Sequence, residues 1–136
     1  KCSPAMFELG DGKLNEDVVL PAKNYERFAK FLEKLRRSSK LAIPTFGHLG
    51  DGNLHYNQSK PEAGENAAFI SSQPEVNAIV HDLAHELGGS ISAEHGIGQL
   101  KRQEMLRYKD ALEMEMMRSI KRTFDPQGLM NPGKVL

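Results

Sequence analysis

Two histidines flank a glycine-rich turn, and their spacing could bring two imidazoles to one metal ion. His48 and His55 lie on either side of the segment Gly50-Asp51-Gly52-Asn53. Asp-Gly and Gly-Asn steps between apolar residues are typical of a β-hairpin turn. If Leu49 faces Leu54, then His48 faces His55, with Cβ atoms about 5 Å apart on one side of the sheet. We therefore expect both to bind a metal ion as neutral imidazoles. The alternative is a glycine-rich turn with two incidental histidines.

A second candidate pair, Glu94 and His95, is followed by Gly96 and Gly98. Adjacent residues of an extended chain point to opposite sides, so one could bind a metal while the other faces a substrate. Two histidines and one carboxylate are a common ligand set with an open position in catalytic zinc sites, and manganese or iron(II) also accepts it. Alternatively, Glu94 only caps the helix that follows, where a carboxylate is favoured at the positive end.

Three other features are weaker indications of chemistry. His81 and His85 have the i, i+4 spacing of a helical zinc-protease site, with Asp82 in the place of the usual glutamate. Both flank the apolar stripe of a predicted helix, so we expect a surface pair. Neither a phosphate-binding loop nor a Gly-x-Ser-x-Gly turn is present, which leaves nucleotide and serine hydrolases unsupported. Methionines at helical spacing are expected to fill core space and not to bind copper: Met105, Met114, Met116, Met117 and Met130.

Composition narrows the class of partner. The 136 residues carry no net charge, which favours neither a nucleic acid nor a membrane surface. No apolar run approaches transmembrane length, and no signal peptide opens the chain. The single cysteine, Cys2, excludes a disulfide framework and is consistent with a reducing compartment, so we expect a cytoplasmic protein, or one peripheral to the inner membrane. Because the chain begins at Lys1 without an initiator methionine, we expect a piece of something longer.

Hydrophobic periodicity predicts the elements that must position these residues. Residues 1–15 are expected to be turn-rich, and Pro44 suggests an edge strand or a bulge. The first predicted elements are a strand over 17–20, a helix over 24–39, and hairpin arms over 41–46 and 54–57. A surface loop over 58–72 and a helix from Pro74 to about 87 are expected to follow. The last predicted elements are a short strand over 90–92 and helices over 99–108 and 110–123. This order is typical of an α+β fold with an antiparallel sheet, helices packed on one face and a C-terminal helical arm.

Three segments in this order resemble a known family. They are Gly47-His-Leu-Gly-Asp-Gly-Asn-Leu-His55, Ser92-Ala-Glu-His-Gly-Ile-Gly98 with Lys101 following, and Phe124-Asp-Pro-Gln-Gly-Leu-Met-Asn-Pro-Gly-Lys134. Together with Asn15-Glu-Asp-Val-Val-Leu-Pro21, they resemble the C-terminal part of FAD-linked oxidases of the D-lactate dehydrogenase, glycolate oxidase and D-2-hydroxyglutarate dehydrogenase type. The resemblance runs over nearly the whole chain.

The resemblance implies that two domains of the whole protein have different roles. In that family an N-terminal domain binds FAD, and a cap domain covers the flavin and shapes the substrate site. Residues 1–98 would then be a partial cap domain. Residues 99–136 would be a helical arm and tail that packs on a FAD-binding domain absent from this chain and supplied in cis or in trans.

Carried over residue by residue, the resemblance also implies roles. The residues similar to ligands of zinc or another divalent metal are His48, His55 and Glu94. His95 resembles the base that takes the hydroxyl proton of a 2-hydroxy acid, and Asn57 resembles a substrate contact beside the metal. Asn131 resembles a residue of the tail that returns to the flavin.

Three hypotheses follow. The first is a fragment of a flavin-dependent dehydrogenase that oxidises D-lactate, glycolate or D-2-hydroxyglutarate by hydride transfer to FAD and is inactive alone. The second is a non-catalytic metal-binding or assembly module with a closed four-ligand site. The third is a zinc hydrolase that uses His81 and His85. The substrate, the metal and any homo-oligomer stay open at this point.

Overall fold

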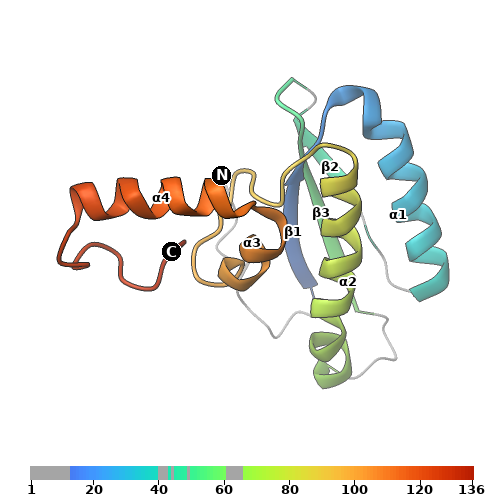
Figure 1. Ribbon diagram of the computed structural model, residues 1–136. Helices are drawn as coiled ribbons and strands as arrows, with labels where there is room; N and C mark the ends of the chain where they lie inside the picture. Colours follow the sequence, from blue (N-terminus) through green and yellow to red (C-terminus); the bar gives the residue numbers. More distant parts are fainter. Residues whose placement is uncertain (1–12, 40–42, 44, 49, 61–65) are drawn as a thin grey trace. The chain divides into compact units, whose positions relative to one another are not determined.

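The computed structural model describes residues 13–39, 43, 45–48, 50–60 and 66–136, and the chain divides into two compact units after Glu94. The first unit contains a three-stranded antiparallel sheet with two long helices, and the second unit is helical (Figure 1). The predicted α+β class is therefore confirmed. Cys2, most of the stretch predicted as turn-rich, and Pro44 with its expected edge position lie outside the described residues.

The sheet has the strand order β1-β3-β2, so that β3 lies in the centre. Strand β1 spans Lys13–Val19, β2 spans Thr45–His48 and β3 spans Asn53–Ser59, and both neighbours run antiparallel to β3. Strand β1 begins earlier than the predicted strand over 17–20, in part of the stretch predicted as turn-rich. The reason is tertiary, because its ladder with β3 continues back to the Lys13–Ser59 pair.

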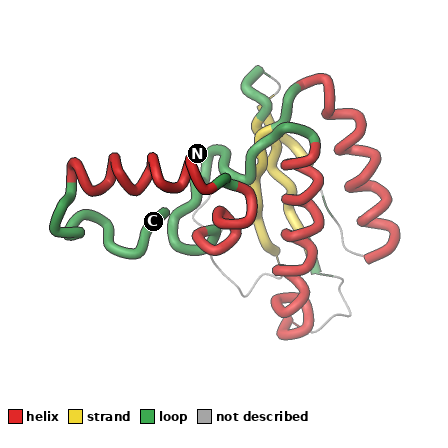
Figure 2. The backbone as a smooth tube through the Cα atoms, in the orientation of Figure 1, coloured by secondary structure: helices red, strands yellow, loops and turns green. Residues whose placement is uncertain are grey.

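Two helices cover one face of this sheet. A single 3₁₀ turn, η2, spans Ala22–Asn24 and leads into α1, Tyr25–Ser39, while α2 spans Asn66–Glu86 (Figures 1 and 2). The buried cluster of this unit joins strand and helix residues: Val18, Leu20, Phe28, Leu32, Ile43, Tyr56, Phe69, Val76, Val80, Leu83, Ala84 and Leu87. Since side chains alternate along a strand, the face opposite Val18 and Tyr56 carries Asp17 and His55.

Helix α2 begins at Asn66, so the predicted start at Pro74 is wrong. The predicted surface loop over 58–72 is wrong at residues 58–59, which end β3, and at residues 66–72, which are helical, while residues 61–65 lie outside the described residues. Pro74 lies inside the helix, where it lacks a backbone N–H for the helical ladder. The apolar face nevertheless continues past it to Phe69, which is 6% exposed. Burial of Phe69 offsets the interruption at Pro74, a balance that the sequence pattern alone does not show.

His81 is the second correction on this helix, because it is buried and not part of a surface pair. The Nε2 atom of His81 lies 3.0 Å from the hydroxyl oxygen of Tyr56. Asn77 joins the same polar network, since its Oδ1 atom accepts from Gln58 Nε2 at 2.8 Å. His85, one turn further on, is exposed as predicted.

The second unit contains α3, Arg102–Tyr108, and α4, Ala111–Phe124. Helix α3 begins later than predicted, because residues 98–101 form turns. Asp110 caps α4 in a reciprocal capping box with Glu113, which fixes its N-terminus close to the predicted position. Among the described helices of the whole chain, none is long and apolar enough to cross a membrane.

Helix α4 exposes a line of apolar side chains while burying only one residue. The exposed residues recur every four positions: Leu112, Met116, Ile120 and Phe124. Met114 is the buried residue of the helix. The expectation that the methionines fill core space therefore holds for Met105 and Met114 and is wrong for Met116 and Met130, which are exposed.

Candidate metal and substrate site

The β2–β3 hairpin places His48 and His55 on one side of the sheet, although not in the predicted register. Gly47, and not Leu49, lies opposite Leu54, and Leu49 itself is outside the described residues. The shift is by an even number of residues, so it leaves both histidines on the predicted side. They are diagonal neighbours instead of direct partners, with ring centroids 6.5 Å apart and planes at 76°.

The turn explains the shifted register. The backbone N–H of Gly52 donates to the carbonyl oxygen of His48 at 3.1 Å, and that of Asn53 donates to Asp51 Oδ1 at 3.0 Å. Gly52 has a φ of +82°, and a Cβ there would lie 2.4 Å from the carbonyl oxygen of Leu20. Glycine is required at this position, where the turn touches the end of β1.

Glu94 reaches the same side of the sheet through a second glycine-dependent contact. After α2, Ser90 and Val19 exchange two backbone hydrogen bonds of 2.9 Å, which is the part of the predicted strand over 90–92 that forms. A Cβ on Gly89 would lie 2.1 Å from the carbonyl oxygen of Val19. This close approach brings the segment that ends at Glu94 beside β1 and β3.

His48, His55 and Glu94 form a cluster in which one ligand atom of each residue lies within 4.8 Å of the others. His55 Nε2 lies 3.3 Å from Glu94 Oε2. Nitrogen and oxygen ligands held about 2.0 Å from a tetrahedral zinc ion are themselves about 3.3 Å apart. The donor set and this spacing therefore suit a divalent ion.

A pocket of about 460 Å³ opens beside the cluster. Its lining residues are Val19, His48, Asp51, Asn53, Ser92, Ala93 and Glu94. Among the described residues, the lining includes the carboxylates of Asp51 and Glu94 and neither a lysine nor an arginine. An anionic ligand would be repelled here unless a cation were bound first. The pocket is thus better matched to a metal ion and its ligand than to a free anion.

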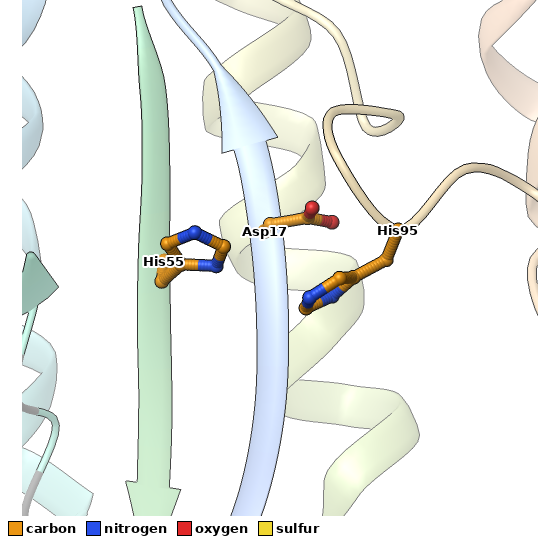
Figure 3. Close-up of side chains that lie close together, drawn as sticks. All are labelled: Asp17, His55 and His95. Atoms are coloured by element: carbon orange, nitrogen blue, oxygen red, sulfur yellow. The ribbon is translucent and has the colours of Figure 1, made fainter. Parts of the chain in front are cut away.

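Two residues that sequence reasoning missed lie against His55. The ring of Phe46 stacks on the imidazole, with centroids 5.1 Å apart and planes at 29°. Asp17 lies directly opposite His55 in the β1–β3 ladder, and Figure 3 shows the two side chains on their adjacent strands. Figure 3 also draws His95, the first residue of the second unit. In the sequence, Asp17 belongs to the predicted strand over 17–20 and to the segment Asn15–Pro21 that resembles the family, but neither indicates a place beside His55.

Asn53 is a third residue that was missed. Its Nδ2 atom donates to Glu94 Oε2 over 3.5 Å, and its Oδ1 atom is buried without a hydrogen-bond partner. Asn57, the predicted substrate contact, lies two positions after His55 on β3 and is therefore on the same face, half-buried.

Glu94 and His95 lie in a turn, so the prediction that they belong to an extended chain is wrong. Glu94 is the last residue of the first unit. His95 begins the second unit and is exposed.

The C-terminal tail holds Asn131 in a left-handed conformation, with a φ of 48°. Asp125 organises the preceding turn, since its carboxylate accepts the backbone N–H groups of Leu129 and Met130, each at 2.9 Å. Lys121 donates to the same carboxylate and to the carbonyl oxygen of Met130. The hydrogen bond from Lys121, followed by those from the two backbone groups, holds the pKa of Asp125 below its usual value.

The structure does not support a zinc-hydrolase site at His81 and His85. Among the described residues, no cluster of three close metal-ligating side chains includes His81 or His85. His81 is buried against Tyr56, whereas His85 is exposed.

An antiparallel sheet that holds two histidines and a carboxylate close together defines an α+β unit with a candidate metal site. The chain belongs to the family described as "FAD linked oxidases, C-terminal domain", which it matches over residues 3–135. The predicted family is therefore confirmed.

Three relatives illustrate the family. The chain is 46% identical over 93 residues to a D-2-hydroxyglutarate dehydrogenase of Stutzerimonas stutzeri (strain A1501), covering 68% of this chain and 20% of the relative. It is 34% identical to a D-lactate dehydrogenase of Anaerostipes hadrus, covering 88% and 25%. It is 32% identical to the glycolate oxidase subunit GlcD of Bacillus subtilis (strain 168), covering 96% and 27%. The chain thus spans about a quarter or less of the length of the first two and 27% of the third.

Proposed function

We propose that this chain supplies the metal-binding and proton-accepting part of a flavin-dependent dehydrogenase that converts a D-2-hydroxy acid into the 2-oxo acid. The observation that carries the proposal is the cluster of His48, His55 and Glu94 in a chain of the FAD-linked oxidase family. The names of the relatives point to D-2-hydroxyglutarate, D-lactate or glycolate as substrate.

The oxidation removes a hydride from the α-carbon and a proton from the hydroxyl oxygen. A divalent ion, zinc or a similar one, would lower the pKa of the substrate hydroxyl when bound. His48, His55 and Glu94 would hold that ion and leave a position open towards the pocket for substrate oxygens.

Two further residues complete this part of the chemistry. His95 would accept the hydroxyl proton as general base. Asn57, half-buried on the same face as His55, would donate a hydrogen bond to the substrate. FAD, held by another domain, would accept the hydride.

The second half of the chain would contact that domain. The exposed apolar line on α4 is what a helix needs to pack on a further domain, in cis or in trans. We propose that residues 99–136 form this arm, that residues 1–98 are part of the cap, and that Asn131 lies in the tail that returns to the flavin. A cytoplasmic location, or one peripheral to the inner membrane, fits the single cysteine.

Isothermal titration of the chain with zinc tests the metal proposal. Alanine at His48 or His55, or glutamine at Glu94, should each abolish or greatly weaken binding, because each removes a ligand. His85→Ala is the matched control, since it removes an exposed imidazole from the same unit. Equal zinc binding by the parent and all three ligand variants would overturn the proposal.

Activity and coordination number separate the dehydrogenase part from a metal module. We expect no turnover when FAD and D-lactate, glycolate or D-2-hydroxyglutarate are added to this chain alone. Turnover would show that no further domain is needed. X-ray absorption on the zinc-loaded chain should count three protein ligands, whereas a fourth protein ligand would favour the non-catalytic module.

A further inference from the structure

Asp17 is a buried carboxylate that the proposed chemistry does not use. Its exposed fraction is 0%, although it lies on a strand whose other face already supplies the hydrophobic core. Burying a carboxylate is costly unless a positive charge or hydrogen bonds accompany it. A buried carboxylate on this face places a negative charge next to His55 of the candidate metal cluster.

The position of Asp17 links it to one proposed metal ligand. It is the direct β1 partner of His55 on β3, and a carboxylate oxygen lies within 4.8 Å of a ring nitrogen of His55. Figure 3 shows the two side chains on these neighbouring strands. Asp17 is not a member of the cluster formed by His48, His55 and Glu94. It adjoins that cluster at His55, which places it to act on the metal through this ligand.

The charge balance of the proposed metal centre also favours a role for Asp17 beside His55. With both imidazoles neutral, Glu94 supplies only one negative charge to a doubly charged ion. A second carboxylate behind a ligating histidine fixes the orientation of the ring and raises the basicity of the ligand. The charge of Asp17 would also bring the sum over ion, Glu94 and Asp17 to zero.

We propose that Asp17 is a positioning residue of the metal centre, where its carboxylate orients the His55 ring and its buried charge stabilises the bound divalent ion. The proposal rests on the proposed function, because it requires metal at His48, His55 and Glu94. It adds a residue on a third strand to that centre, so the ion would depend on the β1–β3 pairing as well as on the hairpin.

Zinc titration of Asp17→Asn is the test, because the amide keeps the shape of the side chain and removes its charge. We expect zinc affinity to fall about 10- to 100-fold. Glu16→Gln is the matched control: it makes the same charge change one residue away, where Glu16 accepts from Asn77 on the helix-covered face. Its zinc affinity should equal that of the parent.

Two further measurements separate positioning from packing and from direct ligation. Val18→Ala weakens the buried core beside Asp17 without changing charge, so it reports what destabilisation alone does to zinc affinity. The ligand count from X-ray absorption should be the same in Asp17→Asn as in the parent.

The outcomes are distinguishable. Loss of affinity in Asp17→Asn alone, with an unchanged ligand count, supports the proposal. Affinity within about twofold of the parent, a loss no larger than that of Val18→Ala, or one fewer oxygen ligand would each overturn it. If His55→Ala also binds zinc as the parent does, the proposed function fails first and this inference fails with it.

Discussion

The hydroxyl oxygen of Tyr56 lies 3.0 Å from Nε2 of His81, on the side of β3 that faces away from His55. Successive residues of one central strand therefore serve two purposes. Tyr56 joins the buried network beneath α2, and His55 belongs to the candidate metal cluster. This alternation allows the stability of the core and the affinity for metal to be tested separately.

Tyr56→Phe should lower the free energy of unfolding by about 1–3 kcal/mol, because it removes a buried hydroxyl that contacts His81 and Asn77. Urea denaturation followed by circular dichroism measures this change. Zinc affinity should be unaffected, since the hydroxyl lies on the helix-covered face. A variant as stable as the parent would contradict the assigned hydrogen bonds.

Gly47→Ala should disrupt the β2–β3 hairpin, because a Cβ there would lie 2.0 Å from the carbonyl oxygen of Asn53. The strands must separate to admit the methyl group, which moves His48 away from His55. We expect reduced thermal stability and weaker zinc binding. Gly50→Ala is the control, as its Cβ would have no neighbour within 4 Å among the described residues beyond its own chain neighbours. Equal losses in both variants would argue against this explanation.

Asp125→Asn should destabilise the C-terminal tail in a pH-dependent way. The pKa of Asp125 is lowered in the folded chain, chiefly by the hydrogen bond from Lys121. Its stabilising effect is therefore present above the unfolded pKa of about 3.9 and is lost as the pH falls through the lower folded value. Melting temperatures of parent and variant should differ most near neutral pH and converge in acid.

The partner of Asp125 can be tested with a double-mutant cycle. Lys121→Met removes the cation that donates to Asp125 and to the carbonyl oxygen of Met130. If the pair is coupled, the double variant should lose less stability than the sum of the single variants. Strict additivity would mean that the backbone N–H groups, and not Lys121, account for the effect of Asp125.

The exposed line on α4 gives a test of the proposed arm. Ile120→Glu should leave the stability of this chain unchanged, because Ile120 is 59% exposed. The same change should weaken association with a FAD-binding domain, since it would bury a charge. Met114→Glu is the contrasting variant: Met114 is 5% exposed, so it should destabilise the chain itself. Binding of the domain that is unaffected by Ile120→Glu would exclude this face as the contact.

The features of the site that could be predicted from the sequence each lie within one short segment. The glycine-rich turn predicted that His48 and His55 share one side of a hairpin, and side-chain periodicity of two preserved that result when the register shifted. Nothing local, however, fixes which residues pair across the turn. The Asp51–Asn53 hydrogen bond and the contact of Gly52 with Leu20 select the register that forms.

The missed parts depend on contacts between distant segments. The burial of His81 and of Phe69 follows from how α2 packs on β3, so neither the helix spacing nor Pro74 could reveal it. Asp17 looked like an ordinary strand residue until the β1–β3 register placed it opposite His55. Hydrophobic periodicity predicts which residues share one face of a helix or strand, but it does not predict which other segment packs against that face.

The amino-acid sequence by itself determined the α+β class, the presence of helix α4, the family and the identity of the candidate ligands. Those properties follow from local spacing and ordered motifs. Only the tertiary structure decided that Glu94 Oε2 lies 3.3 Å from His55 Nε2 and that Asp17 is the β1 residue opposite His55. The physical reason is that both relationships require backbone contacts between segments far apart in the chain, at Val19 with Ser90 and along β1 with β3.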